Sequence, residues 1–360
     1  MIGRSCLGLL AGWIIGTLAG GELHAQPSAS ALEAERRGHE RGSEILLEAA
    51  PNPAADDADR LAEQLKKHPP KVSNVEDPLR LFLLDRQDGS VTLVADEPDP
   101  GSNHLGSPRW SHDGKRILYD AMRGEEYTRL RIKAIERGED APKVTDLGLG
   151  ACPAWSPDDK QIAFLLNSND PAAQAGIWVM EADGSRRRRA GEYGIPLWSG
   201  DNRTFLIVSF GEPRSLRTID IETGAMRPFE LPDGRFRAWP SWAGPDLIVT
   251  VIGTETTSNA VALVQCERQG AQAITAVLWR RSPELDVTPA WPVYSPDTRR
   301  CIFVGESPQG MALYEVEQGK PAQIRRLEKG GPEKRIAGLS LSPGGRFLLF
   351  CSARPIAAPK

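Results

Sequence analysis

A short phrase recurs along this chain, and its spacing limits the possible folds more than any other feature. The phrase joins an aromatic or apolar anchor to a polar turn and an apolar run, as in "PAWSPDDKQIAF" at 153–164. It occurs six times, and successive anchors lie 45, 43, 44, 52 and 47 positions apart. A period of about 45 residues with several strands per unit indicates small β-sheets arranged around a central axis. The anchors of the six copies are Trp110, Trp155, Trp198, Trp242, Tyr294 and Leu341.

A second phrase follows each of the first five copies and completes the unit. It consists of two strand-like runs around a polar turn, as in "IWVMEADGSRRRRAG" at 177–191. The sixth copy lacks this half, but residues 79–96 read "LRLFLLDRQDGSVTLVAD" and match it. The sequence therefore predicts an all-β, six-bladed β-propeller over 79–353, with four antiparallel strands per blade, followed by a tail at 354–360. Pairing of 79–96 with the last unit would close the ring and leave no open sheet edge there.

The polar part of the repeated phrase suits a tight turn between two strands. Pro presets φ for the first turn position, and Asp or Asn can bond to the backbone of its own turn. The alternative interpretation makes the turn acids, Asp113, Asp158, Asp201 and Asp297, metal ligands or catalytic carboxylates. Since these four acids fall in four different blades, the ring would hold them far apart, so we expect a structural role. The large anchors are expected to fill the wedges between blades.

The segment before the propeller has two parts. Arg4, an apolar run at 5–21 and small residues ending at Ala25 are typical of a secretory signal peptide at 1–25. An uncleaved anchor is the alternative, but the apolar run is short for a membrane span. We expect a soluble mature protein, periplasmic or otherwise extracytoplasmic, with no stable membrane insertion. Residues 26–78 are expected to form a helical, partly disordered leader and linker, with helices at 30–50 and 53–68.

Composition limits the classes of partner that we expect and indicates the state of the cysteines. Hydrophobic residues make up 40% and charged residues 26% of the chain, and the net charge is −4. This balance gives no electrostatic reason to expect nucleic acid as a partner. Four cysteines follow the signal segment, inside apolar runs and without a C-x-x-C pair, so we expect buried single thiols rather than disulfides or a zinc site: Cys152, Cys266, Cys301 and Cys351.

The repeats resemble the WD40-like PD40 repeats of TolB-type propellers, and residues 153–191 are similar to one whole repeat. The resemblance covers about residues 79–353 and implies a binding propeller. TolB itself is a periplasmic protein of the Tol–Pal system, whose propeller binds a peptidoglycan-associated lipoprotein and whose N-terminal α/β domain meets other Tol components. Residues 26–78 are too short and too polar for that domain, so only propeller-type binding is carried over. Similar repeats gate prolyl-oligopeptidase-like peptidases, but this sequence has no room for their hydrolase domain.

Motifs that would carry catalysis are missing from the sequence. It contains no G-x-S-x-G nucleophile elbow, no H-E-x-x-H and no P-loop. His112 falls in a repeat turn, which leaves a Ser-His-Asp triad dependent on His104 alone. We therefore expect no catalytic residue, no cofactor and no metal ligand.

Propellers commonly bind ligands at the mouth of the central channel, where the loops leading into the innermost strands gather. Aromatic and Arg side chains on such loops are typical binding anchors. The sequence predicts a monomer that binds an envelope protein through His104, Tyr193, Arg237, Trp239, Asp286 and Arg335. Two alternatives remain open. One is a channel-site enzyme of the lactonase, lyase or hydrolase type. The other is a small-ligand or glycan-binding propeller with Tyr193 and Trp239 as stacking platforms.

Overall fold

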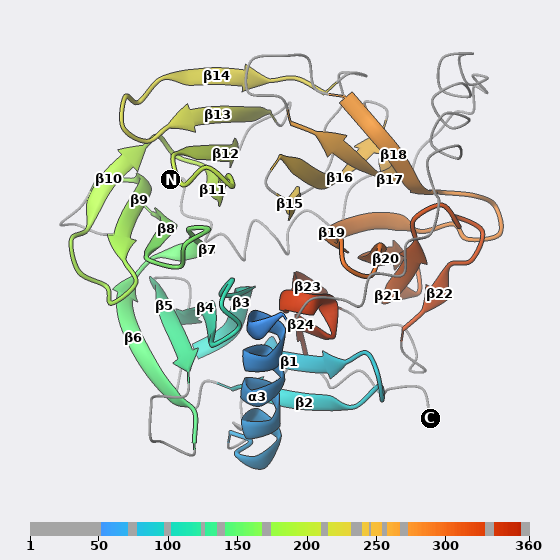
Figure 1. Cartoon of the computed structure of the whole chain (residues 1–360), viewed down its shortest axis with the longest axis horizontal. Coiled ribbons are helices and arrows are strands. Elements are labelled where there is room, and N and C mark those ends of the chain that lie inside the picture. The colour runs from blue at the N-terminus through green and yellow to red at the C-terminus, as the bar shows by residue number, and fades with distance from the viewer. Residues whose placement is uncertain are drawn as a thin grey trace.

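Six four-stranded antiparallel sheets stand around a central axis in the computed structural model, each sheet forming one blade (Figure 1). This confirms the predicted all-β fold, the blade number and the four strands per blade. The structure describes residues 52–70, 78–96, 102–123, 127–134, 141–167, 174–209, 215–231, 240–244, 246–253, 258–266, 273–327 and 335–353. The expected signal peptide at 1–25, the helix expected at 30–50 and the tail at 354–360 lie outside these residues.

In each of the first five blades, the first strand in the chain is the innermost, and the following three lie successively farther from the axis. Blade 1 contains β3 (Ser102–Trp110), β4 (Arg116–Arg123), β5 (Tyr127–Ala134) and β6 (Lys143–Leu149). Blade 2 contains β7 (Ala151–Trp155), β8 (Gln161–Leu166), β9 (Gly176–Glu181) and β10 (Arg188–Gly191). Blade 3 contains β11 (Ile195–Trp198), β12 (Thr204–Val208), β13 (Leu216–Asp220) and β14 (Met226–Phe229). Blade 4 contains β15 (Ser241–Gly244), β16 (Leu247–Gly253), β17 (Ser258–Gln265) and β18 (Ala273–Arg280). Blade 5 contains β19 (Thr288–Ser295), β20 (Arg300–Ser307), β21 (Gly310–Glu317) and β22 (Arg325–Arg326).

Blade 6 joins the first strands of the ring to the last. It contains β23 (Ile336–Leu341), the 3₁₀ turn η1 (Pro343–Gly345), β24 (Phe347–Ser352), β1 (Arg80–Asp85) and β2 (Val91–Ala95). The strand order is β2-β1-β24-β23, and β1 pairs with β24 from Arg80↔Ser352 to Asp85↔Phe347. The predicted closure by residues 79–96 is confirmed.

Three of the four turn acids, Asp113, Asp158 and Asp201, have the structural role expected of them. Asp201 accepts hydrogen bonds from the Ser199 hydroxyl at 2.7 Å and from the backbone N–H groups of Arg203 and Thr204 at 2.9 and 2.8 Å. Asp113 and Asp158 each accept from the serine two positions earlier and from the backbone N–H two positions later. Each of these carboxylates therefore braces its own turn.

The anchors pack against the blades as large apolar side chains. Trp155 and Trp198 are 3% and 4% exposed, and Trp198 meets Phe205 edge to face with ring centroids 4.5 Å apart. Among the described residues, the four indole N–H groups of the tryptophan anchors have no hydrogen-bond partner. These tryptophans therefore contribute through the packing of their large apolar rings and not through hydrogen bonds of the indole N–H.

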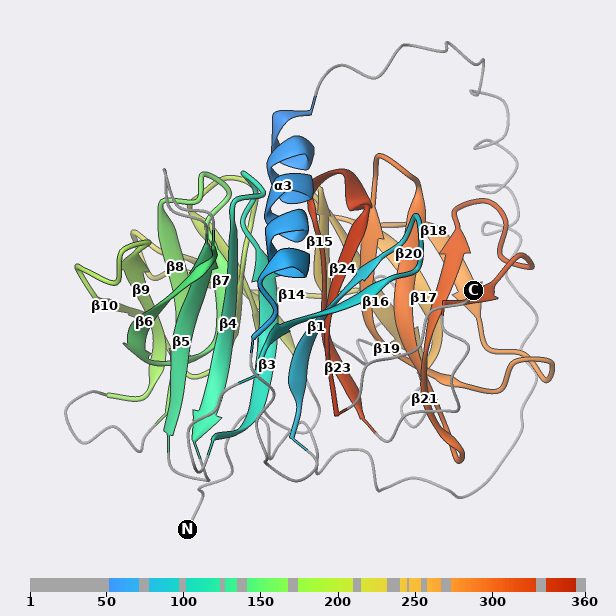
Figure 2. The ribbon, with the colours of Figure 1, turned by 90° about the horizontal axis from the view of Figure 1, so that it is seen from below.

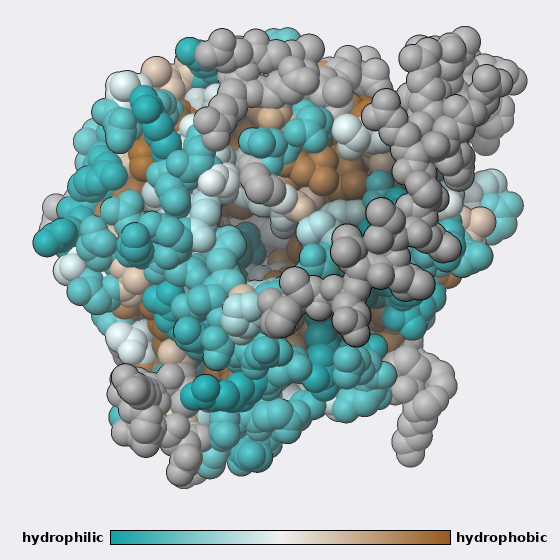
Figure 3. All heavy atoms as spheres, in the orientation of Figure 1, coloured by the Kyte–Doolittle hydropathy of each residue, from teal (hydrophilic) through white to brown (hydrophobic). Residues whose placement is uncertain are grey.

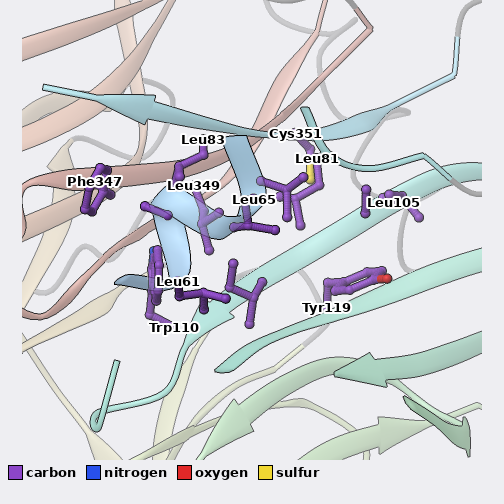
Figure 4. Packing of buried hydrophobic residues seen from close by; sticks show 14 of the residues in the cluster. Leu61, Leu65, Leu81, Leu83, Leu105, Trp110, Tyr119, Phe347, Leu349 and Cys351 are labelled. Carbon is purple, nitrogen blue, oxygen red and sulfur yellow. The ribbon is translucent and has the colours of Figure 1, made fainter. Parts of the chain in front are cut away.

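One helix, α3 (Pro53–Lys67), precedes the ring and confirms the helix expected at 53–68. Asn52 caps it by accepting a hydrogen bond from the N–H of Ala55 at 3.3 Å, and Pro53 stands at its first position. Leu61 and Leu65 are 2% and 0% exposed and pack between blades 6 and 1 (Figures 2 and 4). Their cluster contains Leu81, Leu83, Leu105, Trp110, Ile117, Tyr119, Phe347, Leu349 and Cys351.

Charged side chains reinforce the seam at which α3 meets the closing blade. Asp85, at the end of β1, is 1% exposed. Its carboxylate lies 2.8 Å from the Arg346 guanidinium and 3.3 Å from the Lys66 ammonium. Arg346 also reaches Asp59 of α3 at 3.1 Å. Three separate parts of the chain, namely α3, β1 and the turn before β24, therefore share one ion network.

The cysteines are thiols, as expected. No disulfide joins Cys152, Cys266, Cys301 or Cys351, three of which are buried while Cys266 is partly buried. In the described part of the chain, no helix has both the length and the apolar character that crossing a membrane requires.

Candidate functional site

A cavity of about 620 Å³ lies on the ring axis, at the end where the innermost strands run into their turns. Figure 3 shows this hollow near the middle of the ring. All six anchors line it, together with turn residues that follow them and with Asn52 and Ala54 at the start of α3. The cavity therefore extends from the inner strands toward the face on which α3 begins.

The positions just before the anchors form a ring of equivalent wall residues. All six line the cavity, and five of them are small or apolar: Ala154, Leu197, Ser241, Val293 and Ser340. The sixth is Arg109, on β3. One blade therefore places a cation where the other five present small or apolar side chains.

The Arg109 guanidinium has few partners inside the protein. Its one hydrogen bond among the described residues goes to the carbonyl oxygen of Pro108, at 2.8 Å. Arg carries five N–H donors, so four of those on Arg109 have no acceptor within the described ranges. Burial lowers the pKa of the guanidinium, while the nearby Cys152, Asp120 and Cys351 act in the opposite direction. No carboxylate in the described chain lies within ion-pair distance of it.

Asp120, on β4, lies behind this wall and is 1% exposed. Its Oδ2 accepts the backbone N–H of Cys152 at 2.7 Å, while its Oδ1 is buried with no partner among the described residues. Burial raises the pKa of this carboxyl, although its hydrogen bonds to Cys152 and Ser107 and the attraction of Arg109 oppose the rise. The equivalent positions in the other blades are Leu165, Val208, Val251, Val304 and Cys351.

Strained backbone marks the same wall. Ser107, Cys152 and Trp291 have φ values of 45°, 50° and 52°, in the left-handed region that non-glycine residues avoid. Each occupies the position two residues before the wall ring, where its strand bulges. Strain of this kind costs about 1–3 kcal/mol per residue and collects at functional sites. The bond from Cys152 to Asp120 holds one of these bulges in place.

Of the residues predicted from the sequence, Tyr193, Asp286 and Arg335 lie before innermost strands, as expected. His104 does not lie on a loop, because its backbone is part of β3 and pairs with Met122. Tyr193 is 39% exposed, and its hydroxyl donates to Asn167 Oδ1 at 2.9 Å. Asp286 forms an ion pair with Arg281, and Arg335 directly precedes β23. Arg237, Trp239 and the side chain of His104 lie outside the described residues. Of the described members, none lines the cavity.

Two titratable side chains lie at the open end of the cavity. His112 Nδ1 is 2.9 Å from Asp159 Oδ1, and the His112 side chain is 55% exposed. Asp297 comes from the turn of blade 5. Within the described ranges, no three His, Cys, Asp or Glu side chains are grouped closely enough to hold a metal ion.

Together these features define a TolB-like six-bladed β-propeller with a cavity on its axis. A structure assigned as TolB from Agrobacterium tumefaciens has a TM-score of 0.55 at 16% identity, covering 77% of this chain and 99% of that one, so it shares the fold. TolB from Acinetobacter baumannii has a TM-score of 0.49 at 18% identity, covering 78% of this chain and 66% of that one.

Sequence comparison gives a shorter match. An uncharacterised peptidase of Bacillus subtilis, YuxL, is 30% identical over 119 residues, which is 30% of this chain. The match spans 18% of that relative's length, so it concerns a part of the peptidase only. No family model matches the chain.

Proposed function

We propose that this protein is an exported, non-enzymatic propeller that binds a protein of the cell envelope. The binding surface is the channel mouth formed by the loops before the innermost strands. The observation that carries the proposal is Tyr193, a half-exposed aromatic side chain on one of these loops. Proteins use aromatic side chains held in place in this way as interface anchors.

The hydrogen bond from Tyr193 to Asn167 supports this role. It fixes the phenol ring before a partner arrives, so less rotational freedom is lost on binding. The other large exposed hydrophobic residues of the described chain are Val144 and Met226, on the outer strands β6 and β14. Tyr193 is therefore the large exposed aromatic side chain that the described part of the ring presents on a loop before an innermost strand.

Charged groups at the same mouth provide the specificity in this proposal. Arg281 and Asp286 form an exposed ion pair, and Arg335 directly precedes the last inner strand. Exposed charges of this kind contribute more to partner selection and to the association rate than to affinity. Arg237 and Trp239, which belong to the same set of loops, complete the proposed surface.

Export and the lack of catalysis are supported by the sequence. The first 25 residues have the charge and apolar pattern of a secretory signal, which gives the proposed location in the periplasm or another extracytoplasmic compartment. No nucleophile elbow or zinc-protease motif is present. Cell fractionation of the full chain tests the location, and we expect a form lacking residues 1–25 in the extracytoplasmic fraction.

Site-specific photocrosslinking tests the binding surface. A photoreactive phenylalanine analogue replaces Tyr193 in one variant and Val144 in the matched control, which is exposed on an outer strand. We expect a discrete crosslinked protein from position 193 in cells and none from position 144. The additional change Arg335→Ala should weaken this crosslink. The same adduct from both positions, or none from position 193, would refute the proposed surface.

A further inference from the structure

We propose that the axial cavity binds a small organic carboxylate, whose charged group pairs with Arg109 and whose apolar part contacts the anchor side chains. This site is lined by the inner strands and the turns that follow them, and its lining reaches the start of β11 at Ile195. The protein partner is assigned to the loops before these strands. The two proposals use different residues, Arg109 here and Tyr193 there, so each has its own test.

The first argument is the unmatched charge. Arg109 donates one hydrogen bond, to Pro108, and no carboxylate of the described chain is within ion-pair distance. Arg109 is partly buried in the cavity wall. A partly desolvated cation without an ion partner is less stable than a paired one, and an anion in the cavity would supply the pair. The wall thus contains guanidinium N–H donors for which the described residues provide no acceptor.

The second argument comes from comparing the six blades with one another. The wall position holds Ala, Leu, Ser, Val or Ser in five blades and Arg in blade 1. The position occupied by Asp120 holds an apolar residue or Cys in the other five. Two polar departures from the repeat, next to each other and in one blade only, are not required by the fold, since five blades form without them.

Asp120 supports the Arg109 site without occupying it. Its Oδ2 holds the Cys152 N–H, and with it the bulged wall of blade 2 beside Arg109. Burial raises the pKa of Asp120 above its ordinary value.

The third argument is the shape and lining of the cavity. A volume of about 620 Å³ is within the range of small-molecule sites and far above the space of a few waters. Trp110, Trp155 and Trp198 supply apolar surface around the single cation. A carboxylate matches a guanidinium through two parallel hydrogen bonds, and its single negative charge equals the charge of one Arg side chain.

Isothermal titration calorimetry on the purified protein tests the site with matched acid and amide probes. The free-acid probes are 2-naphthoate and the tripeptide Ala-Ala-Phe, and their partners are 2-naphthamide and the same tripeptide with a C-terminal amide. We expect at least one acid to bind about 10- to 100-fold more tightly than its amide, as a charge-assisted hydrogen-bond pair predicts. Preference for the naphthoate indicates a free acid as ligand, and preference for the peptide indicates a chain-terminal carboxylate.

Three variants assign the effect to the residue. Arg109→Met should bind acid and amide alike, Arg109→Lys should keep a reduced preference for the acid, and Arg188→Met, on the exposed outer strand β10, should bind like the unmodified protein. Equal affinities for acid and amide in the unmodified protein would overturn the proposal. So would the absence of acid binding at millimolar concentration, or an acid preference that persists in Arg109→Met. The acid–amide comparison needs no variant and stands even if Arg109→Met fails to fold.

Discussion

Leu65 is the side chain through which α3 should contribute most to the stability of the closed ring. It is 0% exposed and belongs to the cluster that α3 shares with both strands of the closing seam and with blade 1. The substitution Leu65→Ala removes three carbon atoms, about 2.4 kcal/mol at about 0.8 kcal/mol for each buried methylene-sized group. The cavity left behind adds to this loss, and buried Leu→Ala changes cost about 2–5 kcal/mol. We expect the free energy of unfolding to fall by about 3 kcal/mol.

Urea unfolding followed by tryptophan fluorescence measures this loss, because Trp110 lies in the same cluster. The control is Lys67→Ala, an exposed residue in the last turn of the same helix, for which a change within about 0.5 kcal/mol is expected. A loss below about 1 kcal/mol for Leu65→Ala, with the denaturant slope unchanged, would refute the conclusion that α3 is part of the propeller core.

Three further predictions concern the seam, the turns and the thiols. Burial raises the pKa of Asp85, but the hydrogen bonds from Arg346, the Gln87 N–H and Lys66 outweigh it and hold the pKa below its ordinary 3.8. The Asp85 carboxylate therefore stabilises the fold fully above pH 3.8, and this stabilisation is lost as the pH falls through the lower folded pKa. When unfolding is measured against pH, the free energy of unfolding should fall less steeply in acid for Asp85→Asn than for the unmodified protein. Identical acid profiles would count against the network. Gly114→Ala should destabilise more than Gly224→Ala in thermal unfolding. Both glycines have a φ of about 70°, but an added Cβ at Gly114 would lie 2.1 Å from the Ala54 carbonyl oxygen, while nothing lies within 4 Å at Gly224; equal losses would contradict this packing. Burial, aided by Asp246, raises the pKa of Cys266 to about 12, so alkylation of the folded protein at pH 8 should be slow by mass spectrometry; rapid labelling without unfolding would disprove the burial.

The ring could be predicted from the sequence because the same pattern of anchor, turn and strands occurs in each blade. Six anchors at nearly constant spacing define the blades, and a half-unit before the first copy matches the half missing from the last. The start of α3 was also readable from Pro53 and the charges along the helix. Its burial was not, because Leu61 and Leu65 form only a thin apolar stripe, and the groove that receives them is built from residues far away in the chain.

The axial site was harder to predict. The sequence draws attention to the aromatic and charged residues of the loops before the inner strands, whereas the cavity is lined by the inner strands themselves and by the turns that follow them. Arg109 was overlooked because one Arg next to a repeat anchor attracts no attention by itself. Aligning the six copies would have revealed it, together with Asp120, as a departure from an apolar column. The distance between the two groups, and the missing partners of the guanidinium, depend on side-chain geometry that no alignment contains.

The closure of blade 6 also sets the order in which the molecule can form. Arg80 meets the carbonyl oxygen of Ala353 across 273 positions of chain. Because the ribosome synthesises the chain from its N-terminus, nearly the whole propeller must be made before β1 can pair with β24. Contacts of such long range make folding slow and leave an open strand edge in the meantime. The helix α3 is synthesised just before β1 and β2 and can pack on this hairpin early. It then covers part of the hairpin until β24 has been synthesised and can pair with β1.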